Sequence, residues 1–556
     1  MSLLFYSFIP NINLMRKLAI SILFLLICQI GFSQLLKDKK GITKFDGFFT
    51  FYYDSSDDKI YLEIDNLNSE FLYVRALSEG VGSNDIGLDR GQLGNGVVVK
   101  FQRAGNKLLL IQPNQNFRAL TKNKEEKKSV KEAFAKSVLH GFVIKEEVKN
   151  TFLVDATDFF IRDAHGVANR LEQNKQGSYS LDKTRCAFNI KRTKAFPKNV
   201  EFDVMLTFKG KPKGYNIRSV TPDASSLTVY QHHSFVELPD NNYKQRIFEP
   251  RSGSYPMSYL DYATPVNRSI VKRFIYRHHL EKKDQSAEVS EAVEPIIYYL
   301  DRGAPEPIRS ALMEGAGWWN QAFEAIGFKD AFQVKLLPEG VDPLDSRYNV
   351  IQLVHRSTRG WSYGGSISDP RTGEIIKGHV SLGSLRIRQD FLIAQGLQAP
   401  YETNDSDDDF AMQMALARIR QLSAHEVGHT LGFTHNFAAS STNRSSVMDY
   451  PHPQLNLKEG KIDFSKAYAT GIGEWDKVTV AYSYQNFDGN EEEQLHKILN
   501  EAFAKGLRFI SDQDARPKGS AHAFGHLWDN GSDISDELIN VLNIRTKAIE
   551  NFSSDN

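Results

Sequence analysis

Residues 425–435 read HEVGHTLGFTH and contain three histidines and a glutamate in a regular spacing. His425 and His429 lie four residues apart, so in a helix both imidazoles lie on one face and can share a metal ion. Glu426, between them in the sequence, borders the metal from a rotated position. It can take a proton from water without becoming a ligand. The spacing therefore predicts a metal-binding helix that carries its own general base.

Gly432 determines how the third histidine reaches this metal. A glycine permits a left-handed exit from the helix, where a Cβ would cost energy. The chain can then turn back and bring in His435, which a continuous helix would hold about 15 Å from His425 along the axis. Three neutral histidines suit one catalytic Zn²⁺ and leave a position open for water. In this prediction His425, His429 and His435 bind zinc, while Glu426 acts as general base and protonates the leaving amine.

A second motif, SSVMDYP, occupies residues 445–451 and contains Met448 and Tyr450. Together with HExxHxxGxxH it resembles the metzincin clan of zinc endopeptidases. The closer likeness is to large exported bacterial proteins described as zinc-dependent metalloproteases. Other stretches similar to that family are HHSFVELP (232–239), GIGEWDK (471–477) and AHAFGHLWDNGSD (521–533).

This resemblance implies a fold and roles for two further residues. The expected catalytic domain has a mixed twisted sheet, an active-site helix and a Met-turn. Met448 would pack as a soft apolar floor beneath the zinc ligands. Tyr450 would donate a hydrogen bond to the developing oxyanion, the alternative being a buried structural tyrosine.

The resemblance also implies an edge strand that binds an extended peptide or protein substrate in antiparallel fashion. The matching segment is WSYGGSIS, residues 361–368. Its two glycines would let a peptide approach closely, or would form a bulge. The residues expected on this strand are Trp361, Tyr363, Gly364, Gly365 and Ser366.

The N-terminus carries a targeting signal. Residues 15–34 read MRKLAISILFLLICQIGFSQ, which has a positive start, a short apolar run and small residues before Gln34. This pattern is typical of a signal peptide over residues 1–33. The apolar run is short for a membrane span, so we expect none in the mature chain. The protein is expected to be exported, to the periplasm, the outer surface or the medium.

The remaining sequence predicts an α+β organisation. Alternating strand patterns make residues 34–265 a β-rich region that serves as a prodomain, a binding module or both. Residues 266–292 contain a charged segment and are predicted to be a linker. The catalytic domain is expected at 293–485, with helices over about 305–326 and 408–430. A helical subdomain is expected at 486–556.

Composition excludes several classes of protein. The chain has 68 Lys+Arg and 68 Asp+Glu, so a nucleic-acid partner, which usually requires a basic surplus, is not expected. Of its two cysteines only Cys186 follows the signal, which excludes an internal disulfide. NDSDDD (404–409) is not an EF-hand loop, because Phe410 and Leu416 replace its glycine and glutamate, so Ca²⁺ is a possible but unsupported second ion. The sequence does not set the oligomeric state.

Two alternative functions remain at this stage. The first is a cell-surface binding protein whose zinc site is structural or vestigial. The second is a zinc hydrolase that acts on a substrate other than a peptide. An open coordination position distinguishes a catalytic site from a structural one.

Overall fold

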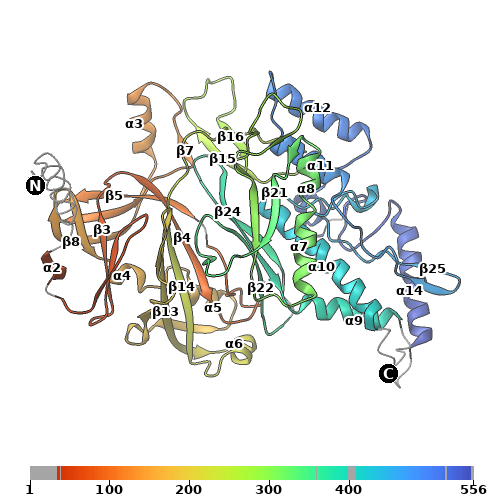
Figure 1. Cartoon of the computed structure of the whole chain (residues 1–556), viewed down its shortest axis with the longest axis horizontal. Helices are drawn as coiled ribbons and strands as arrows, with labels where there is room; N and C mark the ends of the chain where they lie inside the picture. Colours follow the sequence, from red (N-terminus) through yellow and green to blue (C-terminus); the bar gives the residue numbers. More distant parts are fainter. Residues whose placement is uncertain are drawn as a thin grey trace, which may run out of the picture.

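The structure is a computed structural model that describes residues 34–37, 39–94, 96–358, 360–398, 408–519 and 522–552. The predicted signal peptide and most of the segment considered for calcium lie outside these residues. Among the described helices, none combines the length and apolar character needed to cross a membrane. Figure 1 shows three parts in sequence: a β-rich part in red to yellow, a second sheet in green, and helices in green to blue.

The N-terminal region forms a 13-stranded sheet in which all pairings are antiparallel. Its order is β1-β2-β3-β9-β8-β6-β5-β4-β14-β13-β10, with β11 and β12 also paired to β13. The strands are β1 (Ile42–Phe45), β2 (Phe51–Asp54), β3 (Lys59–Ile64), β4 (Glu70–Glu79), β5 (Val97–Ala104), β6 (Lys107–Gln112), β8 (Ser137–Val148), β9 (Thr151–Asp155), β10 (Gly177–Leu181), β11 (Ala187–Phe188), β12 (Lys194–Ala195), β13 (Asn199–Pro212) and β14 (Ser226–Val236).

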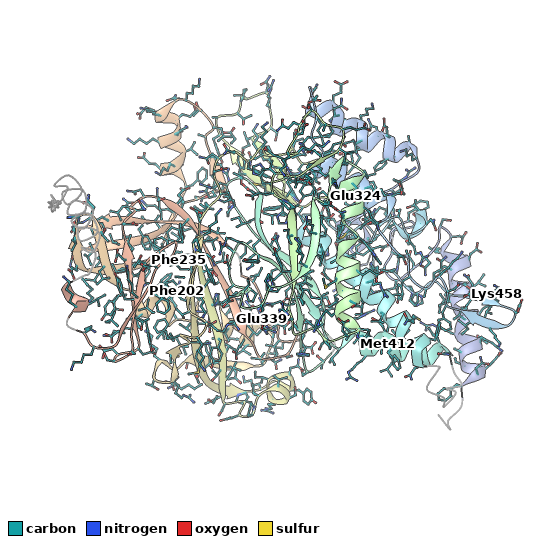
Figure 2. The ribbon with its side chains drawn as sticks, viewed as in Figure 1. Phe202, Phe235, Glu324, Glu339, Met412 and Lys458 are labelled. Carbon is teal, nitrogen blue, oxygen red and sulfur yellow. The ribbon has the colours of Figure 1, made fainter. Side chains whose placement is uncertain are left out.

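Alternating apolar residues give this sheet a buried face rich in aromatic side chains. Phe202 and Phe235, labelled in Figure 2, are both fully buried, with ring centroids 5.8 Å apart. Aromatic rings bury large areas and prefer such tilted contacts. The helices of this region are short: α2 (Gln34–Lys37), α3 (Lys124–Ala133), α4 (Thr157–Phe160), α5 (Val167–Gln173), α6 (Tyr215–Val220) and the 3₁₀ turn η1 (Lys183–Arg185).

The segment 266–292, predicted as a linker, contains three short strands between exposed stretches. It contains β16 (Val271–Ile275), β17 (Arg277–His278) and β18 (Ser290–Glu291). β16 pairs with β15 (Pro256–Asp261), which also pairs with β7 (Phe117–Arg118). The charged composition misled the prediction because two-residue strands such as β18 are held by backbone hydrogen bonds and need few apolar side chains.

The second sheet has the mixed topology expected of the catalytic domain. Its order is β17-β24-β22-β19-β21, all parallel, and β23 runs antiparallel to β24 along the edge. β23 has no other strand partner among the described residues. The strands are β19 (Ile296–Leu300), β21 (Phe332–Leu336), β22 (Asn349–Val354), β23 (Tyr363–Ser368) and β24 (Glu374–Gly383), and the short β20 (Phe328–Lys329) pairs with β18.

The predicted helices 305–326 and 408–430 both occur, with one difference. The second is α10 (Asp408–Thr430), whereas the first begins later and divides into α7 (Ile308–Gly317) and α8 (Asn320–Glu324). Gly315 lets α7 pack closely on α10, because it has no side chain. A Cβ at this position would lie 2.0 Å from the Arg420 carbonyl oxygen. The remaining elements are α9 (Arg386–Gln398), η2 (Ser440–Thr442), β25 (Asn456–Lys458), β26 (Lys461–Asp463), α11 (Glu474–Tyr484), α12 (Glu491–Ala504), α13 (Asp512–Ala515) and α14 (Ile534–Asn551).

Candidate metal centre and substrate cleft

The three histidines of the HExxHxxGxxH motif converge at the end of α10. His425 and His429 share one face, with ring centroids 4.8 Å apart. Gly432 has a φ of +101°, the left-handed turn expected there. A Cβ on Gly432 would lie 2.1 Å from the Tyr276 carbonyl oxygen, so a close chain contact also requires this glycine. His435 then approaches to ring-centroid distances of 5.2 Å from His425 and 4.7 Å from His429.

The donor atoms fit a metal ion. Each Nδ1 lies against an oxygen: Val447 O at 2.9 Å for His425, Phe433 O at 2.9 Å for His429, and Asp512 Oδ2 at 2.6 Å for His435.

With Nδ1 protonated by these contacts, each Nε2 offers its lone pair to the common centre. One ligand atom from each ring lies within 4.8 Å of the other two. Nε2 of His435 is buried without a hydrogen-bond partner, as expected for a nitrogen whose partner is a cation.

Burial, together with the neighbouring imidazoles, lowers the pKa of His425 well below 6.5 and that of His429 to about 3. These two rings are therefore held in the neutral form that metals require.

Glu426 lies buried between α10 and the edge strand. Burial raises the pKa of its carboxyl group to about 8, although the nearby Arg418 and a hydrogen bond from the Gly364 N–H both favour the carboxylate. A carboxyl group whose pKa is close to neutral is suited to accept and return a proton.

The two glycines of β23 lie in different surroundings, and only one of them is required by a close contact. A Cβ on Gly364 would lie 2.1 Å from the Glu426 carbonyl oxygen, so the strand crosses the helix too closely for any side chain. A Cβ on Gly365 would meet only Leu93 Cδ1 at 3.7 Å, an ordinary contact distance. The irregular register of β23 falls between Ile367 and Ser368, so the glycines are not the site of a bulge.

Met448 lies beneath the ligands as the resemblance implies. It is 1% exposed, and its Sδ would lie 2.3 Å from a Cβ at Gly428 on α10. The Met-turn around Met448 is held by buried Asp476, the aspartate of GIGEWDK. Its carboxylate accepts hydrogen bonds from Ser446 Oγ at 2.6 Å and from the Val447 N–H at 2.8 Å. Since Val447 O in turn holds His425, α11 orients a metal ligand through the Met-turn.

Two phenols flank the histidines. The Tyr450 ring lies 5.4 Å from that of His425 and 4.7 Å from that of His435, and stacks on Trp528 at 5.3 Å. Burial raises its pKa to about 12, so the hydroxyl stays protonated at neutral pH. Tyr255 lies on the other side, with its hydroxyl 3.2 Å from His429 Nδ1.

The structure separates the residues predicted for the edge strand. Trp361 precedes β23 and is 62% exposed. Tyr363 turns toward the N-terminal region, where Arg356 lies over its ring at 5.8 Å and pairs with Asp89. Alternation along the strand accounts for this, because neighbouring side chains point to opposite faces. Of the predicted set, Gly364, Gly365 and Ser366 line a cleft beside His429.

Several site residues were not predicted. Asp512 and Trp528 lie beyond the expected catalytic limit of 485, and Tyr255 lies before its start. Asp476 and Trp528 belong to the stretches GIGEWDK and AHAFGHLWDNGSD, which resemble the bacterial metalloprotease family. That resemblance marks the two stretches but gives neither residue a role. Asp512 and Tyr255 carry no local sequence signal.

Comparisons with known proteins agree with this geometry. Residues 407–556 match a family model described as Met-zincin, while 91–283 and 31–80 match two domains of unknown function, DUF5117 and DUF5118. No curated protein matches the chain. Among solved structures, archaemetzincin from Methanopyrus kandleri is 16% identical, over 37% of this chain and 96% of that one. Its TM-score of 0.15 is too low to support an argument from superposition. The Met-zincin match and the triad of His425, His429 and His435 together fit a metzincin-type zinc metalloprotease.

Proposed function

We propose that this protein is an exported zinc endopeptidase that cleaves extended peptide segments of its substrates. The observation that carries the proposal is the position of Glu426, buried beside three converging imidazoles and directly under the strand edge. A general base must lie within reach of both the attacking water and the substrate, and this place satisfies both needs.

The residues divide the chemistry between them. His425, His429 and His435 would hold Zn²⁺, which would supply Lewis-acid polarisation of the scissile carbonyl and of the attacking water. Glu426 accepts the proton of the attacking water and passes it to the leaving amine. The phenol of Tyr450 donates a hydrogen bond to the oxyanion that develops on the carbonyl oxygen. The free edge of β23 aligns the peptide backbone.

Cleavage of an unfolded protein by the zinc-loaded chain tests this proposal. Glu426→Gln should retain zinc and reduce the rate by about 10²–10⁴-fold, the usual contribution of general base catalysis. The matched control is Glu501→Gln, which makes the same change at an exposed site on α12 and should leave the rate unchanged. Full activity in a zinc-loaded Glu426→Gln variant would show that the mechanism is wrong.

Export is a separate part of the proposal and has its own test. A signal peptide over residues 1–33 predicts that the exported protein begins at Gln34. Terminal sequencing of protein recovered outside the cytoplasm measures this directly. A protein that keeps residues 15–33, or that stays in the cytoplasm, would contradict export without affecting the chemistry.

A further inference from the structure

A cleft of about 830 Å³ begins beside His429 and extends along β23. One wall belongs to the catalytic sheet and includes Gly364, Gly365 and Ser366. The opposite wall comes from the N-terminal region: the end of β6 at Gln112, the following residues 113–116, and the start of β5. The metal centre therefore opens into a groove with two walls, built from parts of the chain about 250 residues apart.

The catalytic wall presents backbone groups to this groove. The Gly364 N–H is directed at the Glu426 carboxylate, which means that it is turned away from β24. Along an antiparallel strand the outward-facing backbone groups belong to alternate residues, so Ser366 also faces the groove. Because Glu426 engages the Gly364 N–H, an added peptide strand can pair with the Gly364 carbonyl and with the backbone groups of Ser366.

The opposite wall is rich in side-chain amides, which come from Gln112, Asn114, Gln115 and Asn116. The amides of Gln112 and Gln115 make no hydrogen bond within the described part of the chain, and so remain available to a ligand. Among the described residues, none that lines the groove has an acidic or a permanently basic side chain. An uncharged wall offers no counter-ion to a charged substrate residue, whose partial burial would then be costly.

Arg118 holds the two walls in a fixed relation. Its guanidinium donates to the Arg371 carbonyl oxygen at 2.8 Å and to the Pro370 carbonyl oxygen at 2.9 Å. These two residues lie in the turn that joins β23 to β24, whereas Arg118 lies two residues after Asn116, the last residue of the amide-rich segment. The N-terminal wall is thus tied to the strand that faces it across the groove.

We propose that the amide-rich wall selects peptides whose residues before the scissile bond are uncharged. This inference rests on the proposed peptidase function. The direction follows from the strand: β23 runs from the metal at Gly364 outward to Ser368, so an antiparallel peptide enters at Ser368 and runs toward the metal. The residues that fill the groove are those on the N-terminal side of the cleaved bond. The N-terminal region is then a permanent part of the substrate site.

The test is a digest of unfolded proteins by the full zinc-loaded chain, with cleavage sites mapped by mass spectrometry. Charged residues should be depleted about tenfold at the three positions before the cleaved bond and much less after it. Gln115→Glu should raise the ratio of basic to acidic residues at those positions by about tenfold, since it adds one charge to the wall.

The matched control is Gln173→Glu, which adds the same charge to the same region at an exposed site outside the groove lining. It should reproduce the wild-type profile. The inference is overturned if charged residues are equally frequent before and after the cleaved bond. It is also overturned if Gln115→Glu and Gln173→Glu give the same cleavage profile. Absence of cleavage, or cleavage that Glu426→Gln does not slow, overturns the proposed function itself.

A binding measurement repeats the test without turnover. In the Glu426→Gln background, fluorescence anisotropy compares peptides that differ only by Lys or Asp at those three positions. Gln115→Glu should shift the ratio of the two dissociation constants about tenfold toward the Lys peptide. An unchanged ratio would argue against the wall as a specificity determinant.

Discussion

The N-terminal sheet and the candidate metal centre both bury closely spaced histidines, but the ring nitrogens have different partners in the two places. In β14, His232 places Nδ1 3.0 Å from Asp203 and Nε2 against Glu201. The next residue, His233, points to the other face and contacts the Tyr73 hydroxyl at 2.8 Å. Both nitrogens of each ring have protein partners, which is typical of a structural role.

In α10 each histidine of the pair has one nitrogen against a carbonyl oxygen and the other turned toward the common centre. The spacing explains the contrast, because neighbours on a strand diverge whereas residues four apart on a helix converge. In this protein the α10 pair can share a metal ion because its free nitrogens meet, whereas the β14 pair has all its ring nitrogens satisfied by the protein.

The largest effect should come from removing one imidazole at the metal centre. His429→Ala should lose zinc and reduce peptide cleavage by at least about 10⁴-fold, because a metal ion supplies several kcal/mol of transition-state stabilisation. His232→Ala, the same change in β14, should retain zinc in the folded protein. Metal analysis and cleavage rates measure both. Equal zinc loss in the two variants would show that the two histidine pairs do not differ in metal binding.

The corresponding effect in β14 should be on stability. His232→Ala leaves Glu201 and Asp203 buried without their partner, so the free energy of unfolding should fall by about 3–5 kcal/mol. Urea denaturation measures this. The double variant with Glu201→Gln should recover part of the loss, since it removes one of the uncompensated charges. A loss below about 1 kcal/mol in the single variant would mean that His232 does not form ion pairs with Glu201 and Asp203.

A smaller effect is expected where a carboxylate orients a metal ligand. Asp512→Asn should weaken zinc binding by about 10–100-fold, since partners that orient a histidine usually contribute this much. Asp514→Asn, an exposed aspartate on the same helix, is the control. Competition with a zinc chelator gives both affinities. Identical affinities would mean that α13 contributes no orientation.

The most gradual effect is the pH dependence of the N-terminal sheet. Burial alone would lower the pKa of His232, but Glu201 and Asp203 outweigh it and raise the pKa to about 9. A pKa raised in the folded state stabilises the fold fully below the unfolded value of 6.5, and this contribution disappears as pH rises through about 9. Stability should therefore decrease by up to about 1.4 kcal/mol per pH unit over this window.

Denaturation of the wild type and of His232→Gln at pH 6, 7.5 and 9 isolates that contribution. The difference between the two proteins should narrow as pH rises. A constant difference would assign the effect to other groups.

Some of this protein could be predicted from short stretches of sequence. The limits of α10 agree with those predicted, and the approach of His425, His429 and His435 follows from helix periodicity and one glycine. These features depend on local geometry, which neighbouring residues in the sequence determine. The antiparallel edge strand was also expected, although Trp361 lies before its first residue, Tyr363.

The remaining features required tertiary packing. Asp512 lies 77 residues after the histidine that it orients, and Arg118 is 252 residues from Pro370, one of the two residues whose carbonyls it binds. Residues 266–292 form short strands through backbone pairing that their composition did not indicate. The candidate metal ligands and the proposed base could be recognised from the sequence alone, because their geometry is set within one helix and one turn. The carboxylate that contacts His435, and the residues that face the strand across the groove, became visible only in the folded structure, because contacts between distant segments depend on how whole sheets pack.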